Sequence, residues 1–256
     1  MSADVLLDRP APRVARITLN TPETRNAASP GRTKLLRQLF DQALDDETVG
    51  AVVFTGAGGN FASGGNVKGF GTREPIEFLG SVRQAQALLR RVLQGDKPVV
   101  AAVEGFAAGA GVGMACMCDV IVADANTRFV FPFTRIGMVP DLGLHYTLGQ
   151  RIGPARARRI MLLAQTLDGP DAERLGLVDE LATAGQVQER ALELAQQLAA
   201  GPPAAMASLR RGFYVAAAAL ESVLEYEAAA MAIAVTGHES REGVAAFLEK
   251  RPPRFS

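Results

Sequence analysis

Asp141 and His145 are two chemically versatile side chains that lie close together in this sequence. His145 follows Asp141 by four residues, and Pro140 directly precedes the acid. If this stretch is helical, the two side chains share a face and can form a hydrogen bond. A single carboxylate in such a place can take a proton from one carbon and return it to another. An Asp before an apolar helix also serves as a helix cap, and a lone His often only packs, so both alternatives stay open.

Two glycine-rich loops offer chemistry of a second kind, based on main-chain N–H groups. The first loop covers residues 60–67 and includes Gly64 and Gly65, and the second covers residues 105–114. Each follows an apolar stretch typical of a buried strand, and the second is expected to open a helix, where free N–H groups attract negative charge. Either loop alone is explained by tight turns and close packing. Together they favour a binding site.

Ser63 and the two cysteines complete the set of candidate reactive side chains. Ser63 lies in the first loop, so a serine hydrolase that uses Ser63, His145 and Asp141 is an alternative to simple packing of a small side chain. Cys116 and Cys118 are two residues apart in an apolar segment, which is a poor spacing for a mutual disulfide. We expect buried thiols and a reducing compartment.

Composition and charge exclude several classes of protein. The chain has 256 residues, with 27 basic and 27 acidic side chains, so its net charge is zero. No global field therefore draws it to nucleic acid or to an anionic membrane. We also expect no transmembrane span, no secretory leader and no metal site, which together indicate a cytoplasmic globular protein.

The elements that must position these groups alternate between strands and helices, which predicts an α/β fold with a largely parallel sheet. Beyond Ala184 the sequence is almost entirely helical in pattern, with one apolar stripe at Leu220, Val223, Leu224, Ala228, Met231 and Val235. The expected elements are a hairpin of 5–7 and 14–19, helices over 30–47 and 75–93, and strands over 51–55, 98–103, 120–123 and 128–131.

Five motifs, in one order along nearly the whole chain, resemble those of the enoyl-CoA hydratase/isomerase, or crotonase, family. They are Arg25-Asn26-Ala27, the loop 61–68, the segment 102–111, Cys118-Asp119 and the tail 242–251. The resemblance implies a crotonase-type spiral of β-β-α units over 1–195 and a C-terminal helical trimerisation region over 196–256. It also implies a homotrimer or a dimer of trimers.

The same resemblance assigns roles at the reaction centre. It places the N–H groups of an oxyanion hole on Gly65 and Ala110, which would stabilise the charge that develops on a thioester oxygen. The positions at which family hydratases carry two glutamates are Gly113 and Phe133 here, and neither side chain can move a proton. Asp141 instead resembles the base of enoyl-CoA, dienoyl-CoA and ring-epoxide isomerases. His145 would then tune Asp141.

Coenzyme A would arrive as part of the substrate, with no permanently bound cofactor. By resemblance, Arg25, Gly64 and Lys68 lie along its path and main-chain groups of Ala27 and Ala62 bind the adenine. Phe247 and Lys250 would reach the nucleotide from a neighbouring subunit. Solvated surface positions are an equal alternative for the charged side chains and are expected for Arg151, Arg156, Arg158 and Arg159. The region 69–88, with Phe70, Ile76, Phe78 and Leu79, is expected to form part of the acyl pocket.

The sequence therefore predicts an acyl-CoA enzyme that performs an isomerase-type proton transfer, in fatty-acid or aromatic-acid CoA metabolism. Asn66 stands where many family members carry Asp, so chemistry that needs a charge there is not expected. Three alternatives stay open at this point. They are a hydratase with atypical acid and base residues, a thioesterase that uses Ser63, and an acyl-CoA-binding protein without catalysis.

Overall fold

A six-stranded sheet forms the centre of the protein in the computed structural model, which describes residues 3–65, 75–215 and 220–253. The strand order is β1-β2-β3-β4-β6-β9. The first two strands form the predicted hairpin, with Val5 opposite Leu19, and every other pair of neighbours is parallel. The strands are β1 (Val5–Ala11), β2 (Val14–Leu19), β3 (Ala51–Gly56), β4 (Val99–Val103), β6 (Val120–Ala123) and β9 (Glu180–Leu181).

A second sheet of three strands, which the sequence did not predict, lies beside the first. It consists of β5 (Phe106–Ala108), β7 (Arg128–Val130) and β8 (Thr166–Asp168) in the order β5-β7-β8. The residues of β5 were expected to be loop, and the strand expected over 128–131 belongs to this sheet rather than to the main one. Strands of three residues are too short to show a periodic pattern, so their pairing is set by tertiary contacts.

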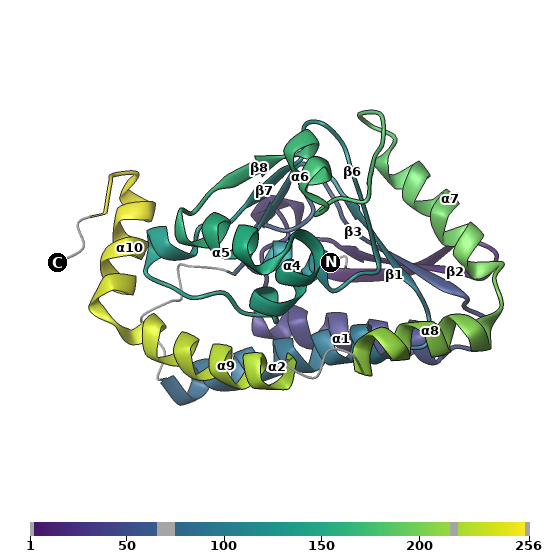
Figure 1. Cartoon of the computed structure of the whole chain (residues 1–256), viewed down its shortest axis with the longest axis horizontal. Coiled ribbons are helices and arrows are strands. Elements are labelled where there is room, and N and C mark those ends of the chain that lie inside the picture. The colour runs from purple at the N-terminus through teal and green to yellow at the C-terminus, as the bar shows by residue number, and fades with distance from the viewer. Residues whose placement is uncertain (1–2, 66–74, 216–219, 254–256) are drawn as a thin grey trace.

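Helices cover both faces of the main sheet, which explains why every residue of β3 and β4 is buried. On one face lies α7 (Val187–Ala199), whose buried residues Val187, Ala191, Ala195 and Ala199 recur every four positions. The other face packs on α1 (Pro30–Asp45) and α2 (Pro75–Gln94). Figure 1 shows these two helices side by side below the sheet, with α7 on its opposite side.

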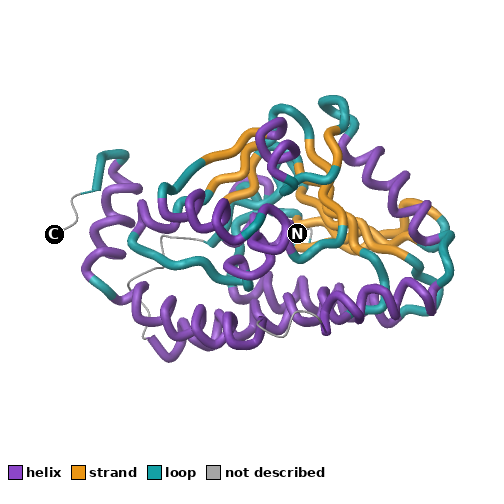
Figure 2. Tube along the Cα trace, in the orientation of Figure 1, coloured by secondary structure: helices purple, strands orange, loops and turns teal. Residues whose placement is uncertain are grey.

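The C-terminal part consists of α8 (Pro203–Val215), α9 (Leu220–Thr236) and α10 (His238–Glu249). Figure 2 shows the helical layer that α8 and α9 form together with α1 and α2. The helical character expected beyond Ala184 is thus confirmed for the described residues. The domain boundary predicted between residues 195 and 196 falls inside the continuous helix α7, and the division of the chain into two domains stays a prediction. The first break in the helical chain after that point comes at 200–202.

Shorter elements connect these layers. They are η1 (Pro22–Thr24), α3 (Ala110–Cys116), η3 (Phe133–Ile136), α4 (Leu144–Ile152), α5 (Pro154–Leu162) and α6 (Gly169–Leu175). Cys116 and Cys118 are buried, free thiols, and burial raises the pKa of Cys116 to about 12 and the pKa of Cys118 still further. Within the described ranges, none of the helices has the length and apolar character needed to cross a bilayer.

Candidate active site

The two glycine-rich loops lie against each other and are joined through their main chains. The N–H of Ala62 donates to the oxygen of Phe106 at 3.0 Å, and the N–H of Ala108 donates to the oxygen of Ala62 at 2.9 Å. Gly64 has a φ of 85°, and a Cβ at this position would lie 2.6 Å from the oxygen of Ala108. A side chain is therefore excluded at residue 64 by both conformation and space.

Gly65 and Ala110 both line a common cavity. The oxygen of Gly64 accepts the N–H of Ala28 at 2.7 Å, which fixes the strand-like segment before Gly65. Gly109, with a φ of 51°, turns the chain so that α3 begins at Ala110. In the described part of the chain, no hydrogen bond uses the N–H of Gly65 or Ala110.

Asp141 lines the same cavity, which has a volume of about 160 Å³. The remainder of the wall is mostly apolar and comes from α1, α2, α3 and the segment before α4. Such a wall suits the acyl part of a thioester. The described lining residues are Ala28, Ser29, Pro30, Thr33, Gly65, Phe78, Ser81, Val82, Ala85, Ala110, Met114, Asp141 and Leu142.

The carboxyl group of Asp141 is poised to exchange a proton near neutral pH. Burial raises the pKa of Asp141 from its ordinary value of 3.8 to about 7, and the nearby charge of Glu227 adds to this increase. A hydrogen bond from the residue's own main chain acts in the opposite direction. A group that titrates near the working pH can serve both as a base and, once protonated, as an acid.

The local conformation around Asp141 differs from the expected helix. The helix α4 begins at Leu144, whose N–H donates to the main-chain oxygen of Asp141 at 3.1 Å. Leu142 and Gly143 between them both have left-handed conformations, with φ values of 53° and 64°. Asp141 is therefore not helical and forms no side-chain cap. The premise for a hydrogen bond between Asp141 and His145 fails, and that expectation is wrong.

His145 instead bonds to Glu227, a buried residue of α9 that the sequence analysis missed. His145 Nδ1 lies 2.7 Å from Glu227 Oε1, and the same oxygen accepts the N–H of His145 at 3.2 Å. Glu227 Oε2 accepts the N–H of Gly143 at 2.7 Å. The signal for Glu227 was present in the sequence, because it lies three residues after Leu224 and four before Met231, within the apolar stripe.

The two positions that would carry the acids of a hydratase are filled in other ways. A Cβ on Gly113 would lie 2.9 Å from the Cβ of Leu142, so the Leu142 side chain occupies the space of any larger residue. Phe133 is buried in η3, and its ring lies next to the turn at Gly109. At position 113 the packing therefore leaves no room for an acid, whereas at position 133 a buried aromatic ring fills the space instead.

The motif Arg25-Asn26-Ala27 stabilises the first loop through hydrogen bonds. Asn26 is buried, and its side-chain N–H groups donate to the oxygens of Ala57 at 2.9 Å and Asn60 at 2.7 Å. Arg25 is exposed, with its guanidinium 5.5 Å from the centre of the Phe106 ring. The oxygen of Ala27 accepts a hydrogen bond from Arg32. Arg25 therefore remains accessible, whereas the Ala27 oxygen already has one partner.

The predicted adenine contact by Ala62 is contradicted by its surroundings. Ala62 is wholly buried, and both its N–H and its oxygen bond within the protein. The buried Gly64 likewise serves the close approach of the two loops. The strand bridge between Ala62 and Ala107 was missed because β5 was taken for loop. Lys68, Asn66 and Phe70 lie outside the described residues.

Phe247 and Lys250, near the C-terminal end of α10, do not line the cavity of their own chain. The Phe247 side chain is 59% exposed, and Lys250 is exposed in the left-handed conformation that ends the helix. Among the residues expected to form the acyl pocket, Phe78 lines the cavity, Ile76 is exposed and Leu79 packs nearby against α9. The contact of Phe247 and Lys250 with a neighbouring subunit's ligand stays a prediction.

Ser63 is not assembled with His145 into a hydrolytic site. Its hydroxyl donates to the oxygen of Thr24 at 2.9 Å, and His145 is engaged by Glu227. No hydrogen bond between Ser63 and either His145 or Asp141 is present among the described residues. The geometry thus lacks the nucleophile and base pair that a serine thioesterase needs.

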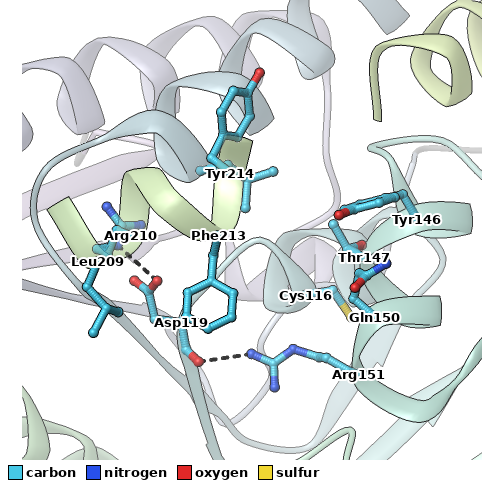
Figure 3. Close-up of a pocket in the computed structure, with 11 residues that line it drawn as sticks. Cys116, Asp119, Tyr146, Thr147, Gln150, Arg151, Leu209, Arg210, Phe213 and Tyr214 are labelled. Carbon is cyan, nitrogen blue, oxygen red and sulfur yellow. Dashed lines mark hydrogen bonds and ion pairs between the residues drawn. The ribbon is translucent and has the colours of Figure 1, made fainter. Parts of the chain in front are cut away.

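A larger cavity of about 440 Å³ lies between α4 and α8, away from Asp141. Figure 3 shows that its two cations are engaged by the protein itself. Arg210 donates to Asp119 at 2.9 Å and to main-chain oxygens, while Arg151 donates to Asp179 at 2.9 Å and to the oxygen of Cys118 at 2.8 Å. Arg151 is thus not solvated as expected, although Arg156, Arg158 and Arg159 are exposed.

Comparisons with known proteins agree with this geometry. The family model described as enoyl-CoA hydratase/isomerase matches residues 11–256. A probable enoyl-CoA hydratase of Rhodobacter capsulatus is 36% identical, over 95% of this chain and 94% of that protein. A 1,2-epoxyphenylacetyl-CoA isomerase of Escherichia coli is 32% identical, over 95% of both chains. The crystal structure of an enoyl-CoA hydratase from Mycobacterium avium subsp. paratuberculosis superposes with a TM-score of 0.90, at 27% identity and 99% coverage of both chains.

Proposed function

The chain belongs to the enoyl-CoA hydratase/isomerase family, and we propose that within it the protein moves a proton along an enoyl-CoA thioester, with Asp141 as the base. The observation that carries the proposal is the cavity shared by the main-chain donors Gly65 and Ala110 and by the carboxyl of Asp141. These three groups are the parts that an enolate mechanism requires.

The proposed reaction begins with the thioester oxygen between the N–H groups of Gly65 and Ala110. Asp141 removes a proton from C2 of a 3-enoyl-CoA, and the electron pair moves into a dienolate whose negative charge rests on that oxygen. The two donors stabilise this charge as it develops. Asp141 then returns the proton to C4, which leaves a 2-enoyl-CoA. The step needs no resident cofactor, since the chain supplies both the donors and the base.

A proton shift is favoured over hydration by the number of acid–base groups in the cavity. Hydration requires a group to orient and deprotonate water as well as a proton donor for the enolate carbon. Asp141 is the one titratable side chain among the described residues that line the cavity. Relatives named as hydratases and a relative named as an isomerase are both similar to this chain, so the names alone do not decide between the reactions.

We also propose which residues bind the coenzyme A part of the substrate. Arg25 and Lys68 would contact its charged groups along the edge of the first loop, and Phe247 and Lys250 would do so from a neighbouring subunit. This arrangement requires a homotrimer or a dimer of trimers. The substrate would be an acyl-CoA of fatty-acid or aromatic-acid metabolism.

The variant Asp141→Asn tests the proposal because it keeps the shape of the side chain and removes the base. Conversion of 3-enoyl-CoA to 2-enoyl-CoA is followed through the absorbance of the conjugated thioester. We expect a rate lower by about 10²–10⁴-fold, the usual contribution of a positioned acid or base. Undiminished isomerisation by the variant overturns the assignment, as does a wild-type protein that hydrates crotonyl-CoA and leaves 3-enoyl-CoA unchanged.

A further inference from the structure

We propose that Glu227 of the C-terminal helix α9 is a positioning residue for Asp141, holding the turn 141–145 in place and keeping a negative charge beside the catalytic carboxyl. The inference rests on the proposed function, in which Asp141 is the base. It assigns to the C-terminal region a part in the reaction centre of its own chain. The residue acts through Asp141 and does not line the cavity.

The hydrogen bonds of Glu227 converge on the segment that directly follows Asp141. Its Oε2 accepts the N–H of Gly143, and its Oε1 accepts both the main-chain N–H and the Nδ1–H of His145. The Glu227 side chain is completely buried, and burial of a carboxyl without such partners would carry a large free-energy cost. Three donors on one carboxyl group therefore fix both the turn and the tautomer of His145.

This turn needs an external support because its own conformation is strained. Leu142 adopts a left-handed conformation with a φ of 53°, although it has a bulky side chain that is almost fully buried. Non-glycine residues in this region persist where the surrounding structure holds them. Glu227 accepts hydrogen bonds from N–H groups of residues that follow Leu142. Gly113 has no side chain, which leaves space for the side chain of Leu142. The position of the Asp141 carboxyl follows from this double constraint.

The helix that carries Glu227 also sets one wall of the cavity. Ala228 and Met231 of α9 pack with Phe78 and Val82 of α2, two residues that line the cavity. The side-chain amide of Gln86 on α2 donates to the oxygen of Leu224 at 2.6 Å. A single helix thus positions the acid and part of the acyl wall, so the two cannot shift independently.

The charge of Glu227 contributes to the proton affinity of Asp141. Burial raises the pKa of Asp141 to about 7, and repulsion by the Glu227 carboxylate adds to that increase. The titratable groups next to this pair are His145, which bonds to Glu227, and Tyr226, whose ring centre lies 6.0 Å from that of His145. The described residues of α1, α2 and α3 that line the cavity have no titratable side chains. Removal of the Glu227 charge should therefore lower the pKa of Asp141.

Two variants separate charge from position. Glu227→Gln removes the charge and at least one of the three hydrogen bonds, whereas Glu227→Asp keeps the charge and withdraws the carboxyl from the turn. For Glu227→Gln we expect the acidic limb of the pH profile of kcat/KM to move to lower pH and kcat to fall. For Glu227→Asp we expect a limb near its original pH and a kcat lower by about 10–100-fold, because misplacement of a reacting group by about 1 Å has effects of this size.

Glu225→Gln is the matched control, since it makes the same charge change on an exposed face of α9. It should leave both the pH limb and kcat unchanged. Residues 225 and 227 differ in burial and in contact with the turn, so a difference between the two variants isolates those features. Circular dichroism and thermal unfolding establish that each variant is folded.

Specific outcomes overturn the inference. A pH limb that stays in place in folded Glu227→Gln, or a kcat that stays at the wild-type value in Glu227→Asp, contradicts it. If Glu227→Gln does not fold, the kcat of Glu227→Asp decides. The proposed function fails separately, through an Asp141→Asn variant that remains fully active. Loss of activity in Asp141→Asn with a wild-type profile in both Glu227 variants would leave the base assigned and remove the positioning role.

Discussion

The two halves of the proposed reaction centre are built in different ways. The donors Gly65 and Ala110 belong to loops that follow central strands and are joined by main-chain hydrogen bonds and by the missing side chain of Gly64. Asp141 lies in a turn with left-handed residues that is held by a side chain from α9. The proposed oxyanion hole thus depends on sterics within the core, whereas the proposed base depends on a carboxyl group that is distant in the sequence.

This difference predicts different responses to mutation. Main-chain donors move only when the backbone moves, so changes in the loops should act through space and conformation. The acid responds also to charge, because its proton affinity depends on its neighbours. The geometry of the oxyanion hole should therefore be insensitive to pH, while the state of Asp141 should vary with it.

Among the substitutions that leave Asp141 in place, the largest effect is expected for Gly64→Ala. The new Cβ would lie 2.6 Å from the oxygen of Ala108, at a φ of 85°, so the two loops must separate. Displacement of one oxyanion donor costs about 2.7–4 kcal/mol of transition-state stabilisation, or roughly 10²–10³-fold in kcat. Steady-state assays of 3-enoyl-CoA isomerisation measure this decrease in kcat.

Gly212→Ala serves as the control for this substitution. Gly212 lies in α8 with open space around its Cβ direction and no positive φ. Alanine there should raise the free energy of unfolding by about 0.5–1 kcal/mol, because it favours the helix, and leave kcat unchanged. Equal activities of the two variants would show that the contact between the loops is unimportant for the donors.

A smaller effect is expected for Gly113→Ala, which tests the turn rather than the loops. Its Cβ would lie 2.9 Å from the Cβ of Leu142 and would push on the residue next to Asp141. Overpacking of this kind costs about 1–3 kcal/mol of stability. We expect kcat to fall with little change in KM, because the acid moves and the donors do not. Chemical denaturation measures the loss of stability, and steady-state kinetics measures kcat. An unchanged kcat in a destabilised variant would contradict the idea that the packing of Leu142 sets the position of Asp141.

The protonation of Asp141 should also be visible in stability. Because burial raises the pKa of Asp141 from 3.8 to about 7, the folded protein retains a proton that the unfolded chain releases between these pH values. The stability that this group contributes is therefore complete below about pH 4 and is lost as the pH rises through 7.

Asp141→Asn, which has no proton to lose, should thus be more stable than the wild type at pH 8, on the order of 2 kcal/mol. This is about half of the full linkage value, because residue 141 as a whole is only partly buried. The advantage should vanish near pH 4. Urea denaturation of both proteins at the two pH values measures it, and a difference independent of pH would contradict the raised pKa.

The smallest effect is expected for Ser63→Ala. The Ser63 hydroxyl makes one exposed hydrogen bond, to the oxygen of Thr24. Its loss should cost about 0.5–1.5 kcal/mol of stability and leave the rate of isomerisation near that of the wild type. Loss of activity together with an acyl-enzyme detected by mass spectrometry in the wild type would instead support a serine thioesterase.

The sequence predicted those features that local patterns encode. The helix from Pro30 has its Ser29 cap, the hairpin and the buried strands β3 and β4 are present, and the two glycine loops do meet. The resemblance to the family also identified positions 113 and 133, at which the sequence has Gly and Phe in place of acids. These features depend on short-range spacing, which one sequence displays directly.

What the sequence did not predict depends on long-range pairing. The strands β5 and β8 are three residues long, and β5 was concealed within a glycine loop. The partner of His145 is Glu227, which lies 82 residues away in the sequence. Glu227 is the one buried acid of α9 and lies within an otherwise apolar stripe. The burial of Ala62 follows from the same unrecognised strand contact. The place of Glu227 in the apolar stripe indicates that it is buried, but no local pattern indicates which distant segment it contacts.

The most direct test of the account is solvent deuterium exchange at C2 of a saturated acyl-CoA. Deprotonation beside the thioester needs the donors Gly65 and Ala110 together with a base, and it needs no double bond in the acyl chain. We predict that the wild-type protein incorporates deuterium at C2, detected by mass spectrometry, and that Asp141→Asn binds the same acyl-CoA without exchange. Exchange at the wild-type rate in Asp141→Asn would contradict the account.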